Sequence, residues 1–146
     1  MKKKLLSLCS LTILALLVLT VGCSKQSNLF KSNKLGFSLA FPDSWKDKYR
    51  IEENDMGITV YFETVEKTKD GSGMLFTFIN KASDNLNEDH FDTIGDIRYF
   101  KVKDVTYVIG GPMDVSFPWD HAEFKTFLKM NEERKEVINT LEILER

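Results

Sequence analysis

The chain is poor in the residues that most often carry chemistry. Its 146 residues include two cysteines, two histidines and three prolines. Cys9 lies in an apolar N-terminal run, which leaves Cys23 as the one cysteine of the remaining chain and excludes a disulfide there. The sequence contains no Gly-x-x-x-x-Gly-Lys phosphate loop, no His-x-x-x-His metal pattern and no Gly-x-Ser-x-Gly nucleophile turn. These absences favour a protein that is not an enzyme and that holds no cofactor.

The first 22 residues differ sharply from the rest. Three lysines at positions 2–4 are followed by Leu5 to Val21, a run of 17 residues without a charge. A positive start and a short apolar run are typical of a secretory signal peptide. Length alone does not separate such a signal from a permanent helix, because about 17 residues is the lower limit for crossing a bilayer. The residues after the run therefore decide between the two.

The residues around Cys23 resemble the lipobox of bacterial prolipoproteins. They read Leu19-Thr20-Val21-Gly22-Cys23, with the small Gly22 before the cysteine and Thr20 where Leu is usual. The resemblance implies cleavage before Cys23 and a diacylglyceryl thioether on its sulfur, and several acyl chains hold a protein stably at a bilayer. The alternatives are a plain signal peptide or an uncleaved helix with a chance cysteine. We predict a signal peptide over residues 1–22 and a location at the cell membrane, lipid-anchored on the extracytoplasmic face.

The chain after this signal is acidic. Three of the 20 basic residues and none of the 22 acidic residues lie in positions 1–22, so 17 basic residues face 22 acidic ones, a net charge of −5. Anionic head groups and nucleic acids repel such a domain. We therefore expect the membrane to be contacted through the N-terminal lipid rather than a polybasic clamp, and we expect no nucleic acid partner.

Residues 23–34 hold the lipidated cysteine and then mostly polar side chains, which predicts a flexible tether. Eleven residues of flexible coil reach on the order of 20 Å. Its three lysines (Lys25, Lys31 and Lys34) either seat the tether on the head groups or simply keep it solvated. A single globular domain is expected over residues 35–146.

Hydrophobic periodicity predicts the elements of this domain. Strands are expected over residues 37–41, 49–53, 57–65, 74–79, 98–102 and 105–109, with turns at 70–73 and 103–104 and a strand end at Gly110-Gly111-Pro112. Residues 84–96 are predicted to be a loop with one helical turn. Three- and four-residue spacing from Asp120 to Leu144 predicts a helix capped by Asp120, either continuous or restarted near Asn131. The fold class is α+β, an antiparallel β-sheet with the C-terminal helix packed on it.

Residues 34–45 resemble the opening strand of the PsbP-like superfamily. In that family an aromatic-rich strand ends in a proline followed by a tryptophan, here Pro42 and Trp45. The resemblance implies an α/β/α sandwich on an antiparallel sheet, with Trp45 in the core. Members include extrinsic photosystem subunits, a nucleotide-release factor for a small GTPase and bacterial envelope lipoproteins, which are mostly adaptors and binding modules. The resemblance supplies no catalytic motif.

Both histidines have acidic neighbours. His90 lies in Glu88-Asp89-His90-Phe91-Asp92, which offers metal-ligand atoms in no strong zinc or calcium pattern, so a solvated acidic loop is favoured and no metal is expected. His121 follows Asp120 and lies near Asp114, an arrangement that would suit general acid–base chemistry only if the groups were in contact. An exposed helix start explains the same residues without catalysis.

The segment between the last strand and the helix carries aromatic side chains among polar ones. Its residues Met113, Asp114, Phe117, Trp119 and Asp120 are the candidate partner or ligand loop, and closure of one end of the core is the alternative. The sequence favours a non-enzymatic, membrane-anchored binding or adaptor domain for an envelope protein partner. A small-molecule or lipid carrier with a cavity between sheet and helix is the second hypothesis. An envelope hydrolase using Asp114, Asp120 and His121 is the third.

Overall fold

Two antiparallel sheets and one α-helix form the part of the chain described by the computed structural model, residues 27–65 and 72–145. The six-stranded sheet has the order β3-β4-β5-β8-β6, with β7 also paired to β8. Its strands are β3 (Tyr49–Asn54), β4 (Gly57–Phe62), β5 (Met74–Asn80), β6 (Phe91–Asp92), β7 (Tyr99–Val102) and β8 (Val105–Pro112). The α+β class predicted from periodicity is confirmed. The predicted signal peptide and Cys23 lie outside the described residues.

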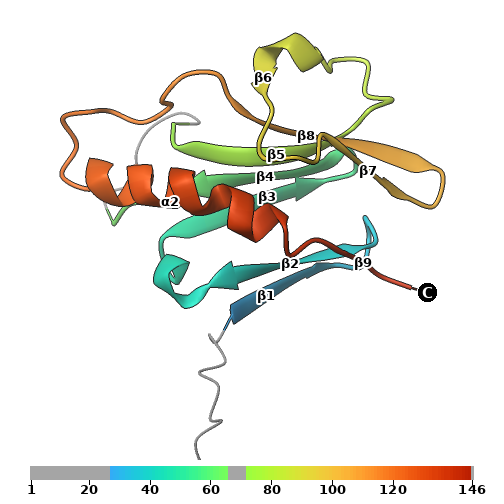
Figure 1. Cartoon of the computed structure of the whole chain (residues 1–146), viewed down its shortest axis with the longest axis horizontal. Coiled ribbons are helices and arrows are strands. Elements are labelled where there is room, and N and C mark those ends of the chain that lie inside the picture. The colour runs from blue at the N-terminus through green and yellow to red at the C-terminus, as the bar shows by residue number, and fades with distance from the viewer. Residues whose placement is uncertain (1–26, 66–71, 146) are drawn as a thin grey trace, which may run out of the picture.

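A smaller sheet lies beneath the first (Figure 1). It has the order β1-β2-β9, formed by β1 (Ser27–Ser32), β2 (Phe37–Pro42) and β9 (Glu142–Ile143). The helix α2 (Phe124–Ile138) contacts both β2 and β5, so it packs beside the small sheet against the large one. Two short 3-10 turns, η1 (Asp43–Trp45) and η2 (Glu88–His90), complete the described elements.

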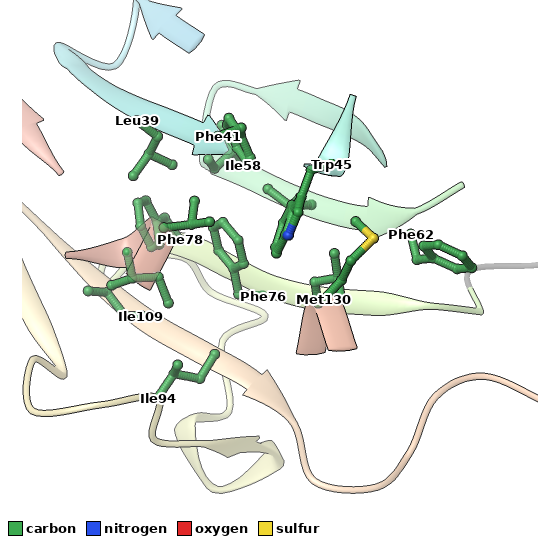
Figure 2. Close-up of a cluster of buried hydrophobic side chains, with 14 of the residues drawn as sticks. Leu39, Phe41, Trp45, Ile58, Phe62, Phe76, Phe78, Ile94, Ile109 and Met130 are labelled. Atoms are coloured by element: carbon green, nitrogen blue, oxygen red, sulfur yellow. The ribbon is translucent and has the colours of Figure 1, made fainter. Parts of the chain in front are cut away.

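The core fills the space between these layers. Alternation along β4 and β5 puts paired residues on one face of the sheet: Ile58 lies opposite Phe78, and Val60 opposite Phe76. All four side chains are buried, and they belong to one core cluster with Trp45 from η1 and Met130 from α2. Figure 2 shows Ile58, Phe76 and Phe78 with these two residues. On the opposite face of the same two strands, Thr59 lies opposite Thr77.

Trp45 ties the helix to the start of the domain. Its ring is fully buried, and its Nε1 donates a hydrogen bond to Oε2 of Glu133 on α2 at 2.8 Å. The Phe41 ring lies 5.9 Å from the Trp45 ring and stacks on Tyr49 at 4.4 Å. A buried indole N–H needs such a partner, so Glu133 fixes the orientation of the ring.

The tether prediction needs correction at its C-terminal end. Residues 27–32 form β1, which pairs along its whole length with β2, from Ser27 opposite Pro42 to Ser32 opposite Phe37. Phe30 packs against the core, and the Ser32 hydroxyl donates a hydrogen bond to Glu53 at 2.5 Å. The pairing and the one inward aromatic outweigh the polar composition that suggested a coil.

The strand predicted over residues 105–109, with Gly110-Gly111-Pro112 as its end, instead runs on to Pro112. Gly110 pairs with Thr77, while Gly111 and Pro112 pair with β6. A Cβ on Gly110 would lie 2.6 Å from the Cβ of Phe91, so glycine lets β6 close over the strand. Proline is tolerated because it is the last residue of the strand.

The helix begins later and ends earlier than its hydrophobic spacing predicts. It runs unbroken from Phe124 to Ile138, so no restart occurs at Asn131, and Asp120 is not its cap. The imidazole Nδ1 of His121 instead accepts a hydrogen bond from the Glu123 amide at 3.1 Å. Beyond the helix, Glu142 and Ile143 pair with β2 as strand β9.

Candidate functional site

The loop between β8 and α2 is fixed at its middle and exposed on both sides. Phe117 is 4% exposed, and its ring lies 5.1 Å from that of Phe62 and 5.0 Å from that of Phe127. The Ser116 hydroxyl donates to the Met74 carbonyl at 3.1 Å. The Ser116 backbone carbonyl accepts a hydrogen bond from the Gly73 amide at 2.6 Å. The loop is therefore held against the start of β5 by Phe117 and by the hydrogen bonds of Ser116.

Apolar side chains project from this loop into solvent. Met113 is 60% exposed, Val115 56% and Trp119 82%. Burying a tryptophan is strongly favourable, so one held in solvent beside a rigid anchor is unusual in a monomer. Five residues of this loop were predicted from the sequence to contact a partner or ligand. Four of them are exposed (Met113, Asp114, Trp119 and Asp120), whereas Phe117 is buried and holds the loop in place.

The hydrolase hypothesis requires contacts that the structure does not form. The ring of His121 packs edge-on against Phe117 at 4.9 Å, and its Nδ1 accepts the Glu123 amide. No hydrogen bond joins His121 to Asp114 or Asp120 among the described residues, and both carboxylates are exposed. In this structure Nδ1 of the imidazole is therefore bonded to the start of the helix.

His90 lies at the end of η2, where its Nε2 is 3.1 Å from the Asn87 amide nitrogen. Within residues 27–65 and 72–145, no three His, Cys, Asp or Glu side chains are grouped so that they could hold a metal ion. In the same residues, no helix is both long enough and apolar enough to cross a membrane.

A hollow of about 280 Å³ lies on the face of the sheet that is turned away from the core. Thr59 and Thr77 are opposite each other on β4 and β5, and their hydroxyls are 3.0 Å apart. The Thr77 hydroxyl donates to the Ile58 carbonyl at 2.8 Å, so Thr59 is the donor of the pair. Met56, Ser83, Asn85, Leu86 and Phe91 also line this hollow. Its lining holds no charged side chain, which suits a small neutral ligand. The carrier hypothesis expected a cavity between sheet and helix, where buried core side chains lie instead.

One arginine holds the outer wall of this hollow in place. Arg98 donates to the carbonyls of Glu88 at 2.9 Å, Phe91 at 3.2 Å and Ile109 at 3.4 Å. Its guanidinium thereby joins η2 and β6 to β8. Nearby, the Tyr99 hydroxyl and then Lys81 and Arg98 lower the pKa of the Glu88 carboxyl. The ionised carboxylate therefore favours the folded state, and this contribution is lost as the pH falls through the folded-state pKa.

Replacing Arg98 with Ala is expected to lower the free energy of unfolding by about 1–3 kcal/mol, because three backbone carbonyls lose a charged donor. The loss should be local, with faster amide hydrogen exchange in residues 87–93 than in β4 and β5. Lys101→Ala on the neighbouring strand β7, whose side chain is exposed, is the matched control. Equal exchange rates in both variants would show that Arg98 does not hold the wall.

Sequence reasoning found the exposed loop and missed the hollow on the outer face. One signal was available: in a strand, alternation places Thr59 on the face opposite Ile58 and Val60. The wall at Leu86 and Phe91 depends on hydrogen bonds from Arg98, which periodicity does not indicate. In comparisons with protein-family models, curated proteins and solved structures, no match to this chain was found.

Proposed function

We propose that this protein is a lipid-anchored, non-enzymatic adaptor that docks an envelope protein through the loop formed by residues 113–120. The lipobox-like residues at Cys23 support the anchor. The observation that carries the docking surface is Trp119, which is 82% exposed two residues after the buried Phe117. An exposed tryptophan is the kind of residue that dominates protein–protein affinity.

Charge around the loop indicates the chemistry of the partner. Asp114 and Asp120 are exposed on either side of Val115 and Trp119. Carboxylates beside the apolar tip disfavour insertion among anionic head groups and favour a protein surface with basic residues around an apolar pocket. The partner is therefore expected to offer a pocket for Trp119 with lysine or arginine at its rim.

The PsbP-like relationship remains a proposal beside this one. It is supported by the antiparallel sheet and by the C-terminal helix that packs on it. The described residues contain one α-helix, so a helical layer on each face of the sheet is not seen in this part of the chain.

A photo-crosslinking amino acid at position 115 in the full-length chain, expressed in living cells, tests the docking surface. We expect one dominant crosslinked protein that is absent when Trp119→Ala is added. The control position is Ile97, which is 41% exposed in the segment before β7. The same products from positions 115 and 97, or a product that persists without Trp119, would contradict docking through this loop.

A carrier of small neutral molecules is the second candidate, and the uncharged hollow on the outer face of the sheet favours it. A volume of about 280 Å³ is near the lower end for ligand sites. Native mass spectrometry of protein purified from membranes would support this candidate if a bound molecule is lost on Thr59→Val. A protein that carries nothing under these conditions would argue against it.

A further inference from the structure

Three lysines converge on a second hollow, between η1 and the first half of α2. The hollow has a volume of about 300 Å³ and is lined by Ser44, Lys48, Lys125, Thr126, Lys129, Met130 and Glu133. The lysines come from two segments that are 77 or more positions apart in the sequence, so the fold alone brings them together. All three side chains are exposed.

The positive charge of this hollow is largely unneutralised. The Lys48 ammonium donates to the Ser44 carbonyl at 3.0 Å, and no ion pair involves Lys48 or Lys125 among the described residues. Glu133 is the one carboxylate in the lining. Its Oε2 accepts from Trp45, and its Oε1 lies 3.7 Å from Lys129. Two lysines without an ion pair in the described part of the chain, Lys48 and Lys125, and two hydroxyl-bearing residues, Ser44 and Thr126, therefore line the hollow. Cationic and hydroxyl groups of this kind suit a phosphate.

The hollow lies close to the point where the chain enters the domain. Ser27 pairs with Pro42, and the side-chain amide Nδ2 of Asn28 donates a hydrogen bond to the Asp43 carboxylate at 3.5 Å. Strand β1 therefore begins beside η1 (Figure 1). Cys23 is four residues before Ser27, and four extended residues span at most about 14 Å. An acyl chain on Cys23 therefore keeps this side of the domain within reach of the head groups.

We propose that the hollow of Lys48, Lys125 and Lys129 binds the phosphate of an anionic lipid head group and sets the orientation of the domain on its membrane. This inference rests on the anchoring part of the proposed function. Residues 23–146 have a net charge of −5, so an anionic membrane repels the domain as a whole. A local basic site therefore determines which side of the domain faces the bilayer. Each lysine near an anionic surface contributes roughly fivefold to binding.

The test supplies the anchor chemically. The chain from residue 23 onward has one thiol, Cys23, which is coupled to maleimide-bearing lipid in vesicles of phosphatidylcholine with or without phosphatidylglycerol. An amine-reactive ester then labels the lysines, and mass spectrometry gives the rate at each one. We expect slower labelling of Lys48, Lys125 and Lys129 only with phosphatidylglycerol. Lys103 lies in the turn between β7 and β8, and Figure 1 shows this turn on the right, on the opposite side of the domain from the start of α2. Lys103 should therefore be labelled at the same rate on both kinds of vesicle.

A double variant gives the proposal a second readout. Lys125→Gln with Lys129→Gln is expected to lower the ratio of docked to undocked domain by roughly 30-fold and to restore fast labelling of Lys48. Lys101→Gln with Lys103→Gln removes the same charge from the β7–β8 hairpin and should change nothing at Lys48. Equal labelling of Lys48 and Lys125 on both vesicles would overturn the proposal.

Labelling in the presence of inorganic phosphate distinguishes a site for a lipid head group from a site for free phosphate. If phosphate without vesicles protected these lysines as well as phosphatidylglycerol does, the hollow would be a site for the free ion and the membrane assignment would be wrong. Because the anchor is coupled in vitro, the result does not depend on lipidation in cells or on the partner of the 113–120 loop. Failure here and failure of the adaptor proposal are therefore distinguishable.

Discussion

Replacing Trp119 with Ala is expected to weaken binding of the protein captured at position 115 by at least about 30-fold, because a central aromatic anchor contributes about 2 kcal/mol or more. The side chain is 82% exposed and packs little in the free domain. Its removal should therefore change the free energy of unfolding by no more than about 0.5 kcal/mol. Calorimetric titration with the captured protein gives the affinity, and urea unfolding gives the stability.

Ile97→Ala is the control for this prediction, since it removes another partly exposed apolar side chain outside the loop. It should leave the affinity unchanged. Quenching of tryptophan fluorescence by acrylamide distinguishes the two tryptophans of the wild-type protein. Trp45 is fully buried, so increased quenching reports unfolding. Trp119 is exposed, so decreased quenching on complex formation reports that Trp119 is covered. An affinity that survives Trp119→Ala would mean that the partner binds elsewhere.

Replacing Phe78 with Ala is expected to lower the free energy of unfolding by about 3–5 kcal/mol, as for other large-to-small changes in a core. Its fully buried ring lies 5.5 Å from Phe37 on the small sheet, 5.5 Å from Phe76 and 5.0 Å from Phe100 on β7. Removing it leaves a cavity where the two sheets meet.

Urea unfolding measures this loss, and Trp119→Ala is its matched control, because it removes a larger ring from an exposed site. Similar small losses for both variants would show that the layers are not joined through Phe78. A loss confined to Phe78→Ala would place the stability of the domain in the contact between the two sheets.

The strands could be predicted from the sequence because their signal is local. Alternation of large and small side chains identified β2, and runs of β-branched and aromatic residues identified β4 and β5. Lys103, with a φ of 52°, forms the turn predicted between β7 and β8. The edge strand β1 could not be found in this way. It is stabilised by pairing with β2 and by a hydrogen bond from Ser32 to Glu53 on β3, and short windows of sequence contain neither.

The candidate loop shows how much a composition-based prediction leaves open. The sequence marked Phe117 and Trp119 as equivalent aromatics, yet one is buried and the other is exposed. Which one faces inward depends on the rings of Phe62 and Phe127, which come from different elements. The hollow formed by Lys48 and the helix lysines likewise exists only after folding.

The proposed function depends first on the lipidation of Cys23. The most direct test is the intact mass of the protein purified from the membrane fraction of cells that express the full-length chain. We expect a species that lacks residues 1–22 and carries a diacylglyceryl group on Cys23, and Cys23→Ser should retain residues 1–22 and carry no lipid. An unmodified chain that still begins at Met1, or a cleaved chain without lipid, would contradict the anchored adaptor.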